Sequence, residues 1–258
     1  MDACLVTPTT ATTMAEDTSP VALLRLMTWL SPAFPVGAFA YSHGIERAIH
    51  DGLVRDRATL VDWLGDILTL GSGWNDAVIA AEAWRKASAG EDCRDVAELA
   101  EAMAGSRERH METTLQGGAF REAVSAWPGD REIPQERRAS GGPEAGGTKR
   151  PIAGDAPARP VPYPIAVGAA AALHAIPLEA TLTAYCHAFS SNLIQAAVRL
   201  IPLGQRDGVA ALASLEPILL DTAQRALRSS LDDLGSCTMM SDIMSMQHEV
   251  QYSRVFRS

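Results

Sequence analysis

The sequence predicts an all-α fold, in the form of a single bundle-like domain of several helices. The first observation is composition: the 258 residues are 47% hydrophobic but only 5% aromatic, and alanine and leucine, which lose little side-chain entropy in a helix, are abundant. The second is that apolar residues recur at three- and four-residue spacing along most of the chain. The third is that the sequence contains no Asn-Gly hairpin turn and no run with the alternating pattern of a strand.

The first half of the chain divides into a tail and a series of helices. Residues 1–18 are Thr-rich, and we expect a disordered tail there, ahead of a helical domain over 19–258. Ser19 and Pro20 supply an N-cap and a first-turn proline, so the first helix is predicted to begin there and to end at about residue 30. A loop rich in Pro and Gly follows. Further helices are predicted at about 42–50, 56–71, 74–88, 92–104 and 106–125.

Residues 127–162 interrupt this pattern. They contain 7 of the 15 prolines and 6 of the 20 glycines, and almost no large apolar residues. Such a stretch buries too little surface to offset the entropy of ordering it, so we expect a flexible insertion within one domain. A linker between two domains is the alternative. The insertion is the better interpretation because each flank is too small and amphipathic to close its own core.

The second half returns to helical periodicity. Pro202 and Gly204 mark a turn between two long predicted helices. Pro217 falls within the later one and is expected to kink that helix or divide it in two, because proline lacks the N–H that the helix needs. The helices are predicted at about 165–174, 177–200, 209–227 and 242–250.

Charge and hydropathy exclude several classes of partner. The formal net charge of -9 repels phosphate backbones and anionic lipids, so we expect neither a nucleic-acid partner nor a membrane partner. The N-terminus has no basic segment followed by an apolar one, as a secretory signal would. The longest apolar run, Ile165–Leu173, is much shorter than the roughly 18 residues that a membrane helix needs. We therefore expect a cytoplasmic protein.

The search for catalytic motifs finds none. The sequence has no phosphate-binding loop, no Gly-x-Ser-x-Gly motif and no His-Glu-x-x-His motif. The four cysteines are far apart and have no zinc-site spacing, so we interpret them as free thiols. We therefore expect a protein that is not an enzyme and that has no cofactor.

A metal site is weakly indicated near the start of the predicted helix at 42–50. His43 and Glu46 lie three residues apart and share a helix face, but stable metal sites usually need three or four ligands. His50 is about two turns further on, too far to share an ion with His43 in one chain. An incidental polar face is the simpler interpretation, and we predict no metal ligands.

Two segments have the composition of an interaction surface. The first is the loop from Ser31 to Gly37, which leads into Tyr41–Glu46; a rigid connection between helices is its alternative. The second is the tail Gln251–Ser258, which contains two aromatic residues and two arginines. Tyr and Arg are frequent in interface hot spots because they combine contact area with directed hydrogen bonds. A tail packed on its own domain is the alternative there.

These segments resemble the UreF family of urease accessory proteins. The matching blocks are LLRLMTWLSPAFPVGAFAYSHGIERAI, PYPIAVGAAAALHAIPLEATLTAYCHAF with the following SSNLIQAAVRLIPLGQRDG, and LDDLGSCTMMSDIMSMQHEVQYSRVFRS. They occur in the family's order and cover nearly all of residues 20–258 except 127–162. The long insertion and the Thr-rich leader depart from the family pattern, and they put any partner contact near residues 125–165 in doubt.

The resemblance implies a helical homodimer without catalytic activity. It implies binding to UreD/UreH, recruitment of the GTPase UreG, and assistance in nickel insertion into the urease apoprotein. A role in modulating GTP hydrolysis by UreG is a further implication. We expect no arginine inserted at the GTP phosphates. A nickel carrier that uses His43, Glu46 and His50 across a dimer, and a generic helical adaptor, are the alternatives.

The same resemblance implies a set of partner-binding residues from the three blocks. They are Pro35, Gly37, Tyr41, Ser42, Gly44, Glu46, Arg199, Gly204, Gln205, Tyr252, Ser253, Arg254, Phe256, Arg257 and Ser258.

Overall fold

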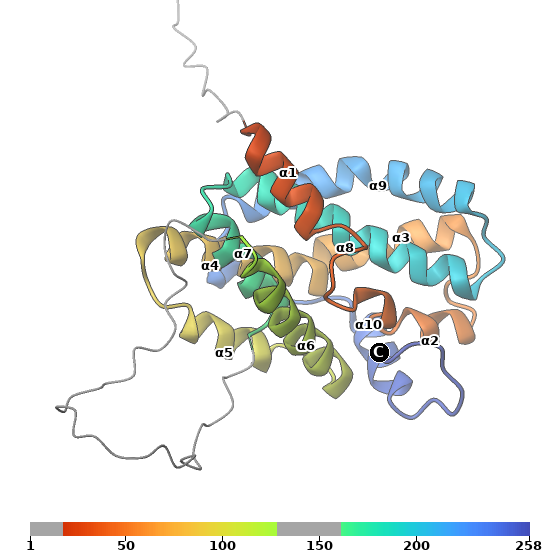
Figure 1. Cartoon of the computed structure of the whole chain (residues 1–258). Coiled ribbons are helices and arrows are strands. Elements are labelled where there is room, and N and C mark those ends of the chain that lie inside the picture. Colours follow the sequence, from red (N-terminus) through yellow and green to blue (C-terminus); the bar gives the residue numbers. More distant parts are fainter. Residues whose placement is uncertain (1–17, 128–160) are drawn as a thin grey trace, which may run out of the picture.

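The computed structural model describes residues 18–127 and 161–258. The described residues form ten α-helices and two 3-10 helices, and no strand, which confirms the all-α prediction (Figure 1). The predicted tail at 1–18 and insertion at 127–162 lie outside the described residues, except at their edges. None of the described helices is long and apolar enough to cross a membrane. The α-helices are α1 (Pro20–Trp29), α2 (Ile45–His50), α3 (Arg57–Leu70), α4 (Ser72–Ala89), α5 (Arg94–Ala102), α6 (Arg107–Val124), α7 (Tyr163–Leu173), α8 (Leu178–Leu200), α9 (Gln205–Ala226) and α10 (Met239–His248); the 3-10 helices are η1 (Ala38–Ala40) and η2 (Leu231–Asp233).

Helix ends follow the capping residues in the sequence. The hydroxyl of Ser19 accepts a hydrogen bond from the N–H of Ala22 at 3.1 Å, and Pro20 occupies the first turn of α1. Asp56 caps α3 by accepting from the N–H of Thr59 at 2.9 Å. Gly90 ends α4 in the left-handed conformation. These local interactions explain why most predicted helices agree with the structure to within a few residues.

Two predicted helices differ from the structure. The helix expected at about residue 42 begins at Ile45, because His43 and Gly44 both have positive φ angles and form a turn. Pro217 was expected to kink α9 or to divide it, and division is excluded, since α9 runs unbroken from Gln205 to Ala226. Pro217 and Ala213 both lie on the exposed side of α9. The Ala213 carbonyl, which would otherwise pair with an N–H at 217, can therefore bond to water.

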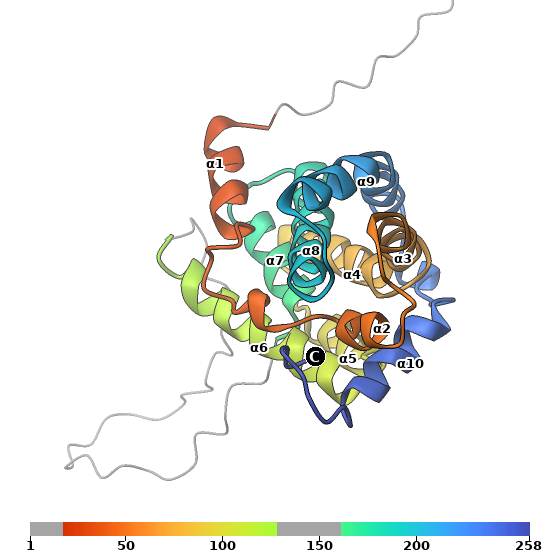
Figure 2. The ribbon, with the colours of Figure 1, turned by 90° about the vertical axis from the view of Figure 1, so that its right-hand side faces the viewer.

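The helices pack around α8. Seen end-on in Figure 2, α8 is surrounded by α3, α4, α7 and α9. One core cluster joins α3, α4, α8 and α9, and a second joins α1 and the loop after it to α6 and α7. The backbones of α4 and α7 nearly touch, because a Cβ built on Gly168 would lie 2.2 Å from the carbonyl oxygen of Ala80. The helices on the two sides of residues 128–160 therefore pack directly against each other.

Residues at both edges of the predicted insertion pack on the helical body. The Trp127 ring packs edge-on against Trp29, with 6.0 Å between ring centroids. Val161 packs against the second core cluster, and Pro162 precedes the first turn of α7. A Cβ on Gly117 would lie 1.8 Å from the Val161 carbonyl oxygen, so only glycine permits this approach.

Candidate partner-binding surface

The segment that follows α10, residues 249–258, returns to the start of α2 (Figure 1). Backbone hydrogen bonds fix its end: the N–H of Ser42 donates to the carbonyl of Ser258 at 2.7 Å, and the N–H of Arg257 donates to the carbonyl of Ala40 at 2.8 Å. The Ser42 hydroxyl also bonds to the Ser258 carbonyl. The Ser258 hydroxyl donates to Glu112 at 2.8 Å. We call residues 249–258 the tail segment.

Glu46 is the main anchor of the tail segment on α2. Its buried carboxylate accepts the N–H of Val255 at 2.7 Å and the N–H of Phe256 at 2.9 Å. A carboxylate can accept several hydrogen bonds, and bonds to a charged acceptor contribute roughly 1.5–3 kcal/mol each. Glu46 therefore fixes the backbone at the point where the Phe256 side chain enters the core.

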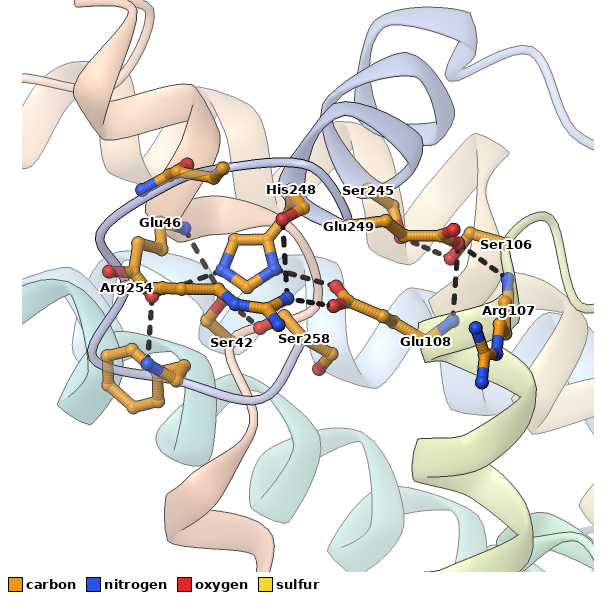
Figure 3. A network of polar contacts seen from close by, with 12 residues as sticks. Ser42, Glu46, Ser106, Arg107, Glu108, Ser245, His248, Glu249, Arg254 and Ser258 are labelled. Carbon is orange, nitrogen blue, oxygen red and sulfur yellow. Dashed lines mark hydrogen bonds and ion pairs between the residues drawn. The ribbon is translucent and has the colours of Figure 1, made fainter.

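His248 joins Glu46 to α6. The ring is completely buried; its Nε2 lies 3.1 Å from Glu46 and its Nδ1 lies 2.6 Å from Glu108 (Figure 3). The guanidinium of Arg254, from the tail segment, bonds to the other oxygen of Glu108. We call Glu46, Glu108, His248 and Arg254 the tail cluster. It connects four parts of the chain: α2, α6, α10 and the tail segment.

A second set of contacts holds α10 against the start of α6. The hydroxyls of Ser106 and Ser245 are 2.7 Å apart, and the Glu249 carboxylate accepts the N–H of Arg107 at 2.8 Å (Figure 3). A carboxylate at a helix N-terminus satisfies a free N–H and interacts favourably with the helix dipole. These bonds place α10, and so the origin of the tail segment, on a fixed base.

Gly44 and Arg199 complete the seat of the tail segment. A Cβ on Gly44 would lie 2.8 Å from the backbone of Ser245, so α2 and α10 meet where a side chain cannot fit. The Arg199 guanidinium donates to the carbonyl of Phe39 at 3.0 Å and lies 4.5 Å from the centroid of the Phe256 ring. Arg199 therefore joins η1, α8 and the tail segment.

The outer side of this assembly exposes apolar and aromatic groups. Tyr252 is fully exposed, and Phe39, Val250 and Val255 are 70%, 84% and 62% exposed. We call these four residues the tail face. Beside it lies an open groove of about 580 Å³, lined by α2, the end of α8 and residues 250–253. Exposed apolar groups on a backbone held by buried hydrogen bonds are typical of a binding surface.

The predicted partner-binding residues divide into supporting and exposed groups. Gly37, partly exposed, has a φ of 72° at the turn before η1. Gly204 and Gln205 lie at the turn between α8 and α9, and no contact joins them to the tail cluster. The buried residues are Tyr41, Ser42, Gly44, Glu46, Phe256 and Ser258; the exposed ones are Pro35, Arg199, Gly204, Gln205, Tyr252, Ser253, Arg254 and Arg257.

A cavity of about 90 Å³, with a cluster of charged side chains in its wall, lies behind the loop that precedes α2. Arg109 on α6 donates to Glu112 at 2.7 Å and lies 3.9 Å from Asp76 on α4, whose carboxylate accepts from the Tyr185 hydroxyl at 3.2 Å. Nε2 of His43 contacts the Ser72 hydroxyl, whereas its Nδ1 has no hydrogen-bond partner among the described residues.

The cavity perturbs the pKa values of three groups. Burial and the charge of Arg109 together lower the pKa of His43 from 6.5 to about 4, although Glu112 opposes the change. Burial raises the pKa of Asp76 from 3.8 to about 6, although Arg109 and Tyr185 oppose the rise. Burial also acts to raise the pKa of Glu112, but Arg109 and His43 outweigh it and lower the value from 4.5 to about 2. The buried cluster therefore contains a neutral imidazole at neutral pH.

The residues considered for a metal site do not converge. His43 faces Ser72, Glu46 faces His248, and His50 bonds to its neighbour Asp51 at the surface. Within residues 18–127 and 161–258, no three His, Cys, Asp or Glu side chains are grouped so that they could hold an ion. The chain as described thus gives no support to a carrier site built from these residues.

Several residues of this region were not predicted from the sequence. His248 shares the buried face of α10 with Met244, four residues earlier, and this spacing was the only available signal. Glu108, Asp76 and Arg109 look like ordinary surface charges in the sequence. Their burial depends on contacts between α4, α6 and α10 that no local pattern reveals.

Comparison with known proteins identifies the family. The UreF family profile matches residues 54–216. The chain is 53% identical to the urease accessory protein UreF 1 of Brucella canis over 239 residues, which cover 92% of this chain and 94% of that one. It is 51% identical to the urease accessory protein UreF of Mesorhizobium japonicum over 245 residues, covering 95% of this chain and all of the relative. These matches extend over almost the entire sequence, and the chain therefore belongs to the UreF family of urease accessory proteins.

Proposed function

We propose that this protein is a scaffold for urease maturation, which binds UreD/UreH through the tail face and recruits the GTPase UreG for nickel insertion into the urease apoprotein. It acts by positioning these proteins and has no catalytic site of its own. The observation that carries the proposal is the tail face: Tyr252 and Val255 project fully or largely into solvent from a backbone that Glu46 holds in place. Preorganisation of this kind lowers the entropy cost of binding.

Two arginines of this region, Arg254 and Arg199, support a positioning role over a role at the GTP phosphates. Arg254 is bonded to Glu108, and Arg199 is bonded to the Phe39 carbonyl and stacked on Phe256. An arginine that stabilises phosphoryl transfer must be able to reach the nucleotide. We therefore propose that any effect on UreG turnover arises from how UreG is held.

We also propose that the protein works in the cytoplasm as a homodimer. The exposed side of α1 supports self-association, because Val21, Leu24 and Met27 are each more than half exposed and follow one another at three-residue spacing. Sedimentation of the parent and of a Leu24→Glu variant tests this. A parent that is monomeric at micromolar concentration would contradict the dimer.

The binding proposal is tested by co-purification of UreD/UreH with variants of the tail face. Tyr252→Ala and Val255→Ala are expected to weaken the complex roughly 10-fold or more, as truncation of hot-spot residues does. Val209→Ala is the matched control, because Val209 is 69% exposed on α9, away from the tail segment. Equal recovery of UreD/UreH with all three variants would exclude the tail face as the binding surface. Deletion of residues 251–258 gives the full extent of the effect.

A further inference from the structure

The tail cluster alternates cations and anions in one buried chain of contacts. It runs from Arg254 to Glu108, from Glu108 to His248 at 2.6 Å, and from His248 to Glu46 at 3.1 Å (Figure 3). Glu46 then accepts two backbone N–H groups of the tail segment. His248 is the only member that contacts both carboxylates, and its side chain has no exposure to solvent.

Counting donors and acceptors in this chain determines the protonation of the ring. Both oxygens of Glu46 already accept backbone N–H groups, and one oxygen of Glu108 accepts from Arg254, so both carboxylates act as acceptors. Each ring nitrogen of His248 faces one of these acceptors. A neutral imidazole has only one N–H, and its other nitrogen would place a lone pair against a carboxylate oxygen. Two ionised carboxylates, one on each ring nitrogen, are matched by two N–H donors, that is, by an imidazolium.

We propose that His248 is a positioning residue for partner binding: its imidazolium bridges Glu46 and Glu108 and thereby holds the tail segment, and with it the tail face, in place. This inference rests on the proposed function of the tail face. The parent cluster contains two cations and two anions. Without the ring charge, Arg254 alone would balance two buried carboxylates, and a buried charge without its partner is strongly destabilising. Glu46 is the carboxylate left without a cation, because Glu108 still has Arg254 as its partner.

The first test is spectroscopic and uses the unaltered protein. In protein labelled with ¹⁵N only at histidine, the ring resonances of His248 are identified by their absence from the His248→Gln spectrum. Two protonated ring nitrogens are expected at pH 7.5. A ring with one unprotonated nitrogen would overturn the inference, and this result does not depend on the stability of any variant.

The second test measures the position of the tail segment by amide hydrogen exchange. His248→Gln is expected to make exchange at Val255 and Phe256 roughly 10- to 100-fold faster, because their acceptor Glu46 loses its cation. His110→Gln is the matched control, since His110 is exposed and bonds to a single carboxylate, Glu101, at 2.9 Å. It should leave the tail segment unchanged.

A double variant separates charge from shape. In His248→Gln with Glu108→Gln, the cluster again contains one cation and one anion, and both glutamines can donate along the chain towards Glu46. In the double variant, at least half of the increase in the logarithm of the exchange rate at Val255 and Phe256 is expected to be reversed. No recovery in the double variant would refute a role for the ring charge.

Co-purification with UreD/UreH distinguishes this inference from the proposed function. Faster exchange together with weaker recovery of UreD/UreH supports both the role of His248 and the binding function of the tail face. Faster exchange with undiminished recovery of UreD/UreH overturns the role of His248 in partner binding, and the Tyr252→Ala and Val255→Ala variants then decide separately whether the tail face binds UreD/UreH. Unchanged exchange in His248→Gln overturns the inference, whatever the recovery.

Discussion

Replacing Asp76 by asparagine is expected to stabilise the protein at neutral pH and to have almost no effect in acid. Asp76 lies in the wall of the 90 Å³ cavity with its side chain 17% exposed. Burial raises its pKa from 3.8 to about 6. An acid whose pKa is raised on folding opposes folding when it is ionised. The cost is absent well below pH 3.8, where Asp76 is protonated in both states; it grows as the pH rises from 3.8 towards 6, and it is complete above about pH 6.

The size of the effect follows from the change in pKa. A difference of about two units, at roughly 1.4 kcal/mol per unit, corresponds to about 3 kcal/mol. Asparagine has the shape of the protonated acid and can still accept from the Tyr185 hydroxyl. Arg109 keeps Glu112 as its partner at 2.7 Å. We therefore expect Asp76→Asn to raise the free energy of unfolding by about 2–3 kcal/mol at pH 7.5 and by only about 0.5 kcal/mol at pH 4.

Urea unfolding followed by tryptophan fluorescence measures this difference at the two pH values. Comparing variant with parent at each pH removes contributions that both share, such as that of His43. Asp66→Asn is the control, because Asp66 is exposed on α3, and surface substitutions usually change stability by less than about 0.5 kcal/mol. Destabilisation of Asp76→Asn at pH 7.5 would refute the reasoning, since it would mean that attraction to Arg109 outweighs the cost of burial.

Two further predictions concern the same region. Gly44→Ala should lower the free energy of unfolding by about 2 kcal/mol or more, because the new Cβ would meet the backbone of Ser245 and the φ of 78° is strained for alanine. Gly118→Ala is the control: Gly118 lies within α6 with open space around it, so the change should raise the free energy of unfolding by up to about 1 kcal/mol. Thermal melting measures both variants. Glu112→Gln should cost about 3 kcal/mol at pH 7, because Arg109 and His43 hold the pKa of Glu112 near 2. That cost should diminish as the pH falls below 4.5, and a loss independent of pH would contradict it.

Most of the fold could be predicted because its helices are specified locally. Ser19, Asp56 and Gly90 act on their own helix ends, so the sequence pattern and the structure agree there. Where the outcome depends on packing, the prediction was less accurate. Apolar residues lie on two sides of α1. Ala22, Leu26 and Trp29 form the buried side, and periodicity alone cannot choose between two apolar faces.

Among the predicted partner-binding residues, those with a local signal could also be identified from the sequence, whereas the long-range contacts that hold them could not. The composition of Gln251–Ser258 drew attention to the tail segment, and Tyr252 is exposed as an interface residue should be. Glu46 was also selected, but its part in holding the tail segment depends on His248 and on two backbone N–H groups more than 200 residues away in sequence. Such a contact has no counterpart in spacing or periodicity, and only the three-dimensional arrangement reveals it.

The close approach of Gly117 to Val161 also bears on how fast the protein folds. These two positions are in contact only after the chain between them has closed a long loop, and loop closure costs more entropy as the loop lengthens. Halving that loop would recover roughly 0.6 kcal/mol, enough to accelerate folding up to about threefold if the contact forms before the rate-limiting step. The rate of unfolding would hardly change, because α6 and α7 would still separate across the same surface.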